Sequence, residues 1–263
     1  MFLIDSHCHI DSLISSSNFS YNLKDIMETC FLKNVKFILG ISTTLSQFKH
    51  LKNLVNDYSN IAISCGVHPL YQKEIDSLDY HSLYKLSLDK KVIAIGETGL
   101  DYFHSSDRKK QQQSAFYKHL DVSYQLKKPV IIHARNSYTD ILSILKKEKI
   151  ENFRGIMHCF NGNKSIASKF LDIGMYLSFS GIVTFKNSEQ LRETIKYIPT
   201  NRILIETDAP YLAPEPFRGK TNHPAHVVEI ANCIAKIKNM NVKNFADIVK
   251  KNFTQLFNIS YID

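Results

Sequence analysis

Long apolar runs, an export signal and flexible linkers are all missing from this sequence. No stretch of eighteen or more apolar residues occurs, which excludes a typical membrane-spanning helix. The opening decapeptide MFLIDSHCHI has neither the basic segment nor the long apolar segment of a secretory signal peptide. No Gly/Ser-rich or low-complexity tract interrupts the chain. We therefore expect a cytoplasmic protein without a membrane partner, in which residues 1–263 form one domain.

Paired cysteines are missing as well. The five cysteines include no CxxC pair, and their odd number argues against a disulfide framework. Cys8 and Cys159 lie beside histidines, which makes a metal-thiolate site an alternative. Alternation along a strand would, however, direct Cys8 away from His7 and His9. We interpret the cysteines as packing residues.

The sequence does have an ordinary globular composition with an excess of positive charge. Hydrophobic residues make up 44% and charged residues 22% of the 263 positions, which is enough for a substantial core. The formal net charge of +8 favours a polyanionic partner such as DNA, because phosphate neutralisation grows with positive charge. The same lysines would also suit the solvated faces of helices, so the charge supports a nucleic-acid substrate only together with a suitable site.

Short apolar or β-branched runs recur at wide, fairly regular intervals. The eight expected strands are residues 2–5, 35–40, 61–66, 92–97, 129–134, 155–160, 176–181 and 202–207. Helical periodicity marks residues 44–59, 111–128, 137–150, 223–239 and 244–257. Alternating strands and helices predict a parallel sheet that is buried on both faces. Eight such units predict an α/β fold of the (β/α)8 TIM-barrel type, with a doubly wound open sheet as the alternative.

Ionisable side chains stand where several of the expected strands end. Those at the ends of strands 1, 4, 5, 6 and 8 are His7, His9, Glu97, His133, His158 and Asp208. In a parallel barrel these ends meet at the carboxyl-terminal face, where barrel enzymes carry their active sites. Alternation with a period of two puts His7 and His9 on one side of the chain, as a chelating pair requires.

Four imidazoles and two carboxylates exceed the ligands that one tetrahedral zinc ion needs. They suit two adjacent divalent ions if a carboxylate bridges them, and Glu97 is the natural bridge. Nitrogen and oxygen ligands without thiolate fit zinc or manganese better than magnesium, and the identity of the ion stays open among Mg, Mn and Zn. Two such ions can hold a phosphodiester, activate water and neutralise the leaving oxygen, so hydrolysis is the predicted reaction.

Four further residues are candidates for substrate binding, each with a structural alternative. His68 in GVHP could contact a phosphate or cap its loop. Arg135 could clamp a phosphate oxygen or pair with a loop carboxylate. Tyr102 could stack on a base or close the rim of the barrel. Arg218, in the basic loop RGK, could contact the nucleic-acid backbone or only solvent.

Motifs spread along the chain resemble those of one family. In order, they are DSHCHID, GVHP, GETGLDYF, KKPVIIHAR, HCFNG, SGIVTFKN and ETDAPYLAPEPFRGK, from residue 4 to about residue 228. Together they resemble the TatD family of metal-dependent deoxyribonucleases, within the amidohydrolase-like superfamily. The resemblance implies a metal-dependent (β/α)8 barrel with DNase activity, typically a 3′-to-5′ exonuclease action on DNA.

The resemblance also implies the metal ligands, which are the same six residues. One ion would be held by His7, His9 and Asp208 and the other by His133 and His158, with Glu97 between them. A carboxylate beside the attacking water is placed to accept its proton, and Asp208 is the hypothesised acceptor. Glu97 and Asp208 are thus the predicted catalytic residues.

One departure from the family pattern lies after RGK. There the family commonly has Asn-Glu-Pro, whereas this chain has TNHP, with His223 in the acidic position. The exchange removes a negative charge near the expected substrate loop, so it affects loop contacts and not the metal ligands.

Two other functions are alternatives. A small-molecule amidohydrolase or phosphoesterase on the same barrel would often bridge its metals through a carboxylated lysine on strand 4 or 5, where this chain has Glu97 and His133. A non-catalytic binding protein would be expected to have lost ligands, and all six candidates are present. We expect a monomer with no obligate protein partner.

Overall fold

The computed structural model describes residues 1–15, 22–148 and 153–260. The strands are β1 (Leu3–Cys8), β2 (Val35–Gly40), β3 (Ile61–Cys65), β4 (Val92–Asp101), β5 (Val130–Arg135), β6 (Gly155–Met157), β7 (Tyr176–Phe179) and β8 (Ile203–Ile205). The α-helices are α1 (Ile10–Ser15), α2 (Leu23–Leu32), α3 (Leu45–Leu54), α4 (Gln72–Asp76), α5 (Tyr80–Ser87), α6 (Lys109–Leu126), α7 (Tyr138–Glu148), α8 (Lys164–Leu171), α9 (Glu189–Tyr197), α10 (Val227–Ile237) and α11 (Val242–Phe257). Short 3-10 helices are η1 (Ser106–Arg108), η2 (Gly181–Thr184), η3 (Thr200–Arg202) and η4 (Pro224–His226).

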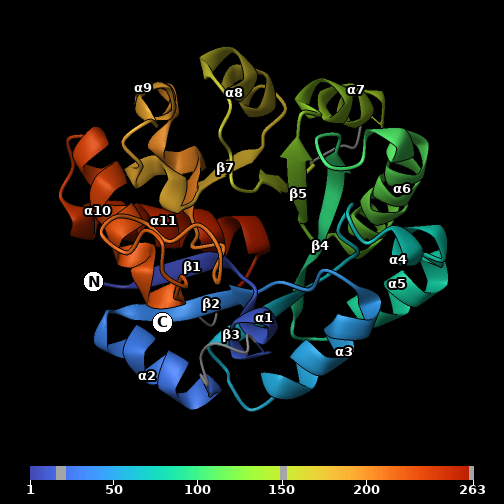
Figure 1. The fold of residues 1–263 in the computed structure, drawn as a ribbon, viewed down its shortest axis with the longest axis horizontal. Coiled ribbons are helices and arrows are strands. Elements are labelled where there is room, and N and C mark those ends of the chain that lie inside the picture. Colours follow the sequence, from blue (N-terminus) through green and yellow to red (C-terminus); the bar gives the residue numbers. More distant parts are fainter. Residues whose placement is uncertain (16–21, 149–152, 261–263) are drawn as a thin grey trace.

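The eight strands form one parallel sheet in the order β1 to β8, which confirms the predicted (β/α)8 barrel. The ring closes where the end of β1 meets the segment after β8. The amide of His9 donates to the carbonyl of Ala209 at 2.8 Å, and the amide of Asp208 donates to the carbonyl of His7 at 2.9 Å. Helices surround the strands on the outside, with α10 and α11 beside β1 (Figure 1).

Local sequence explains where several of the helices begin. The side chains of Thr44, Asp79 and Asn163 each accept a hydrogen bond from a backbone amide in the first turn of α3, α5 and α8. Such caps satisfy amides that have no partner within the helix. Within the described residues, no helix combines the length and the apolar character that crossing a membrane requires.

The strand ends differ from the expected ones in a way that matters for the site. β1 continues through His7 to Cys8, and β4 continues through Glu97 to Asp101, so both ligand candidates lie within strands. β6 and β8 are shorter than expected, and His158 and Asp208 therefore lie in the segments that follow them. The expected helix 137–150 corresponds to α7, and its residues 149–150 lie outside the described residues.

A close approach of two strands allows β4 to run past Glu97. Gly99 pairs with His133 of β5 and has a φ of +132°, a conformation that side chains with a Cβ rarely adopt. A Cβ on Gly99 would lie 2.1 Å from the carbonyl oxygen of His133, so only glycine fits. This contact keeps β4 against β5 directly beneath the carboxyl-terminal face.

A buried histidine joins α6 to the loop after β3. His119 is fully buried, and its Nδ1 donates to the carbonyl of Ala115 at 2.7 Å. Its Nε2 accepts the amide of Val67 at 2.9 Å, which requires the neutral ring because a protonated Nε2 has no lone pair. Burial accordingly lowers the pKa of His119 to about 4. Val67 precedes His68, so this bond helps to position the GVHP loop.

We expect His119 to make the protein less stable in acid. The pKa of His119 is about 4 in the folded protein and 6.5 in the unfolded chain. Between pH 6.5 and 4 the imidazole therefore binds a proton in the unfolded chain and not in the folded protein. The free energy of unfolding should fall by about 1.4 kcal/mol per pH unit between pH 6.5 and 4 from this group alone. Urea unfolding of the wild type and His119→Gln at several pH values in this range measures the difference in slope. Parallel curves for the wild type and His119→Gln would contradict the assignment.

Candidate metal centre

The two histidines at the end of β1 face the same point as Glu97 and Asp208. The Nε2 atoms of His7 and His9 lie 3.3 Å apart. Oε2 of Glu97 is 3.3 Å from His7 Nε2 and 3.7 Å from His9 Nε2. Oδ1 of Asp208 is 3.5 Å and 3.3 Å from the same two nitrogens. Cys8, between the histidines in sequence, is fully buried in the core, as the alternation predicted.

These separations match those between ligands of one metal ion. Ligand atoms at about 2.0–2.1 Å from a tetrahedral ion lie roughly 3.3–3.4 Å from one another. Glu97 Oε2 is buried and has no hydrogen-bond partner among the described residues. A cation between these four side chains would bind both this oxygen and the nitrogens that face it.

The other oxygen of Glu97 faces a second group of histidines. Oε1 lies 3.3 Å from His68 Nε2, 3.1 Å from His133 Nδ1 and 3.2 Å from His158 Nε2. The side chain of Glu97 is only 2% exposed, so these imidazoles take the place of water around it. Each oxygen of one carboxylate thus faces its own set of nitrogen ligands, which is the arrangement that a bridge between two ions requires.

The charges of the centre favour cation binding. Burial by itself raises the pKa of Glu97, but the charge of His158 and the hydrogen bond from His133 help to bring it well below its ordinary value. Burial lowers the pKa of His7 and His68, which favours the neutral ring that offers a lone pair. Burial also acts to lower the pKa of His9, His133 and His158, but their carboxylate neighbours outweigh it and raise the pKa of all three rings. A divalent ion such as Zn or Mn would take the place of those protons between the rings and the carboxylates.

Two carboxylates that the sequence analysis missed hold the outer nitrogens of the histidines. Oε1 of Glu206 accepts from His158 Nδ1 at 3.0 Å and from the amide of Cys159 at 2.7 Å. Oδ2 of Asp101 lies 3.1 Å from His133 Nε2. Such partners select the tautomer and orient the ring of a metal-binding histidine.

Strand alternation contains a signal for one of these residues. Glu97, Gly99 and Asp101 alternate along β4, which brings both carboxylates to the same side of the strand. Glu206 has no comparable signal, because β8 ends at Ile205 and the chain beyond it leaves the strand conformation. His68 was expected near substrate, and the structure brings its ring against Glu97 while its Nδ1 accepts the amide of Leu70 at 3.2 Å.

The remaining candidates lie on the rim of the barrel. The guanidinium of Arg135 stands 4.4 Å from the ring centroid of Phe103, and that of Arg218 stands 3.7 Å from that of Phe185. The hydroxyl of Tyr102 donates to Asp140 at 2.8 Å. All three side chains are thus held by neighbours beside the centre and not within it.

His223 caps a turn in the rim. Its Nδ1 accepts the amide of Ala225 at 3.0 Å at the start of η4, and its side chain is largely buried. The neighbouring Asn222 donates to the carbonyls of Thr207 at 2.8 Å and Tyr211 at 2.6 Å. His223, which stands where the family commonly has an acidic residue, therefore accepts a hydrogen bond within its own loop.

Comparison with known proteins agrees with this geometry. Residues 4–258 match the family model described as TatD related DNase. The chain is 44% identical to the uncharacterized metal-dependent hydrolase YcfH of Escherichia coli strain K12 over 98% of this chain and 97% of that protein. It is 35% identical to the uncharacterized metal-dependent hydrolase YabD of Bacillus subtilis strain 168, over 98% of this chain and 100% of that one.

A solved structure shares the fold along nearly the whole chain. The crystal structure of YjjV, a TatD homologue of E. coli K12, superposes with a TM-score of 0.90. The superposition covers 98% of both chains at 24% sequence identity. The likeness supports the barrel architecture.

Removing the charge of Glu206 should weaken metal binding. In Glu206→Gln, a neutral amide would face His158 Nδ1, so the ring would be a poorer ligand and less firmly oriented. We expect the dissociation constant for Zn²⁺ or Mn²⁺ to rise by about 10–100-fold, as measured by competition with a chromophoric chelator. Glu189→Gln, which changes an exposed glutamate in α9, is the matched control. Equal affinities of the wild type and Glu206→Gln would exclude this supporting role.

Proposed function

Because the chain belongs to the family of TatD-related DNases, we propose that this metal-dependent hydrolase cleaves phosphodiester bonds of DNA, removing nucleotides from the 3′ end with two divalent ions. The observation that carries the proposal is the two-sided environment of Glu97. His7, His9 and Asp208 stand on the side of one carboxylate oxygen, and the other three imidazoles stand around the second oxygen. The net charge of +8 suits a polyanionic substrate.

Divalent ions at this centre would supply charge stabilisation for the phosphate and lower the pKa of a water molecule. His7, His9 and Asp208 are the proposed ligands of one ion, and His133, His158 and His68 are those of the other. Asp101 and Glu206 keep the rings of His133 and His158 in the orientation that directs one nitrogen to Glu97. Asp101 and Glu206 would therefore fix both rings in this orientation before substrate binds.

Hydrolysis then transfers one proton and breaks one bond. The oxygen of water forms a bond to phosphorus, and the bond from phosphorus to the 3′ oxygen of the preceding nucleotide breaks. The leaving 3′ oxygen takes up a proton from solvent and becomes the 3′ hydroxyl of the shortened strand. Asp208 is the proposed acceptor of the water's proton, since its side chain is 13% exposed and solvent can reach it. Burial raises the pKa of Asp208, but the hydrogen bond from His9 and the charge of His158 lower it below its ordinary value, so the carboxylate is ionised and can accept a proton.

A direct assay of DNA cleavage tests the proposed function. Protein stripped with a chelator and reloaded with Mg²⁺, Mn²⁺ or Zn²⁺ is incubated with single-stranded DNA labelled at its 5′ end. We expect stepwise shortening that requires metal and is lost in Glu97→Ala, because the bridge between the two ions is removed. The variant Glu189→Ala, at an exposed glutamate, should cleave like the wild type and excludes a contaminating nuclease.

The same assay separates the alternatives. Shortening of a 3′-labelled strand into long labelled fragments would indicate internal cleavage and contradict the exonuclease action. If the protein binds metal but leaves DNA intact with every ion, the nuclease proposal is wrong. Cyclic amides, esters and phosphotriesters are then the substrates to test.

The role of Asp208 can be separated from that of a metal ligand. In Asp208→Asn the amide keeps the shape of the side chain but accepts no proton, so we expect turnover to fall by about 10²–10⁴-fold. Elemental analysis of the purified variant measures how much metal it retains. Asp247→Asn, at an exposed aspartate of α11, is the matched control. An Asp208→Asn protein with both metals and full turnover would exclude Asp208 as the proton acceptor.

A further inference from the structure

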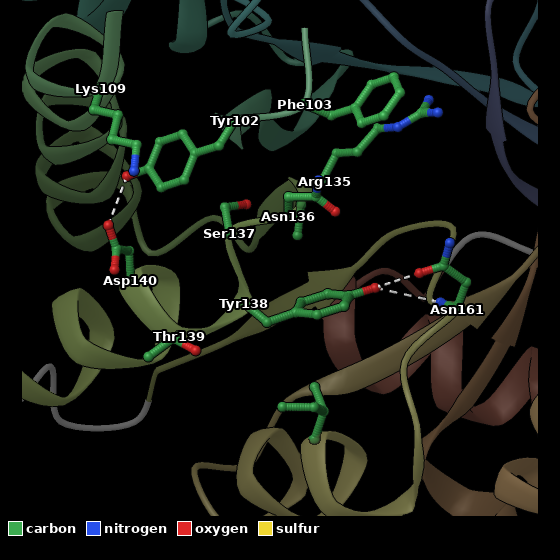
Figure 2. Close-up of a pocket in the computed structure, with 12 residues that line it drawn as sticks. Tyr102, Phe103, Lys109, Arg135, Asn136, Ser137, Tyr138, Thr139, Asp140 and Asn161 are labelled. Atoms are coloured by element: carbon green, nitrogen blue, oxygen red, sulfur yellow. Dashed lines mark hydrogen bonds between the residues drawn. The ribbon is translucent and has the colours of Figure 1, made fainter. Parts of the chain in front are cut away.

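A pocket of about 540 Å³ is lined by residues that adjoin those of the metal centre in sequence. Three of the segments that line it continue from residues of the centre. Tyr102 follows Asp101, Arg135 follows His133 by two positions, and Asn161 follows shortly after His158. Figure 2 shows these side chains around the pocket, together with the first turn of α7. A group bound here and a phosphate at the centre can therefore be parts of one substrate.

Aromatic rings form firm walls of this pocket. The ring of Tyr138 packs against Phe160 and Phe170, with centroid distances of 5.7 and 5.8 Å. The hydroxyl of Tyr102 donates to Asp140 at 2.8 Å and accepts from Gln113 at 2.9 Å. Because neighbours already hold both rings, a flat ligand could stack here at a low cost in side-chain entropy.

The polar groups of the pocket are placed to read the edge of a flat ring. The hydroxyl of Tyr138 donates to Asn161 Oδ1 at 2.8 Å, which sets the orientation of the amide. Figure 2 shows the Nδ2 group of Asn161 pointing away from Tyr138. It can therefore donate to a ring nitrogen or carbonyl oxygen of a ligand.

Two cations at the border of the pocket add a preference for anions. The ammonium of Lys109 lies 4.4 Å from the ring centroid of Tyr102, and the guanidinium of Arg135 lies the same 4.4 Å from that of Phe103. Arg135 is exposed, so a phosphate oxygen can reach its guanidinium. The aromatic rings can stack on a base, the oriented amide can donate to its edge, and the cations can contact a phosphate. These are the three kinds of contact that a nucleotide offers.

We propose that this pocket binds one nucleobase of the substrate, from a nucleotide that flanks the cleaved phosphate, with its ring against Tyr138 and its polar edge toward Asn161. The inference rests on the proposed DNase function and adds the side chains that contact a base. A base in this pocket would be unstacked from its neighbours in the strand.

Ligand binding tests the pocket independently of cleavage. Isothermal titration of the full-length, metal-loaded protein compares thymidine 5′-monophosphate with 2-deoxyribose 5-phosphate, which lacks the base. We expect the nucleotide to bind about tenfold or more tightly, because a base stacked on an aromatic side chain adds affinity. Tyr138→Leu, which retains an apolar contact with the core, should lose this advantage. Tyr124→Leu changes an exposed tyrosine of α6 and should retain it.

Cleavage of a modified strand provides the second readout. One single-stranded oligonucleotide carries normal bases, and others carry one abasic residue at the last or the penultimate 3′ position. The wild type should lose about tenfold or more in kcat/KM on one of the abasic strands. In Tyr138→Leu the ratio between the normal and that abasic strand should fall to about one. Circular dichroism checks folding, and Asn161→Ala, at an exposed residue, is the second variant if Tyr138→Leu does not fold.

The outcomes distinguish this inference from the proposed function. If the wild type cleaves normal and abasic strands equally and binds both phosphates equally, the pocket assignment is wrong while the DNase function stands. A preference for the base that persists in Tyr138→Leu and Asn161→Ala would mean that the base binds elsewhere, which also overturns the assignment. If no strand is cleaved under any metal, the DNase function fails and the nucleobase assignment fails with it.

Discussion

The structure of the site depends on one buried carboxylate that is surrounded by histidines. Glu97 is 2% exposed, and removing such a charge from water costs several kcal/mol unless cations or hydrogen-bond donors replace the water. Five imidazoles from four loops or strand ends approach its two oxygens. The segments that carry those rings must therefore approach one another at Glu97. This approach determines how they are arranged at the carboxyl-terminal face of the barrel.

The barrel meets this requirement with rigid supports below and around the histidines. Gly99 lets β4 pass close to β5, which sets the spacing between Glu97 and His133. His119 holds the backbone next to His68 from the side of α6. Asp5, buried in β1, accepts the amide of Thr207 at 2.8 Å and so ties the first strand to the segment that carries Asp208. Each support is a directional hydrogen bond or a close backbone contact, which leaves the rings little freedom.

The centre and the adjoining pocket are continuous parts of one surface. Asp101 orients His133 below the rim, and the next residue, Tyr102, forms a wall of the pocket. His158 faces Glu97, and the loop that follows it carries Asn161 to the far side of the same pocket. Residues of the centre and residues that line the pocket are thus separated by one to three positions in sequence. A change in these loops can alter the pocket and leave the side chains around Glu97 unchanged.

Strand periodicity and the positions of ionisable residues were enough to predict the barrel and to bring the six ligand candidates to one face. Parallel strands that end at the same face leave few other arrangements, and alternation decides which side of a strand each residue occupies. Three things depended on contacts between distant segments: the approach of His68 to Glu97, the bond from His158 to Glu206, and the cap that His223 forms in its own loop. Local patterns do not encode these contacts, because each depends on where loops from different strands meet in space.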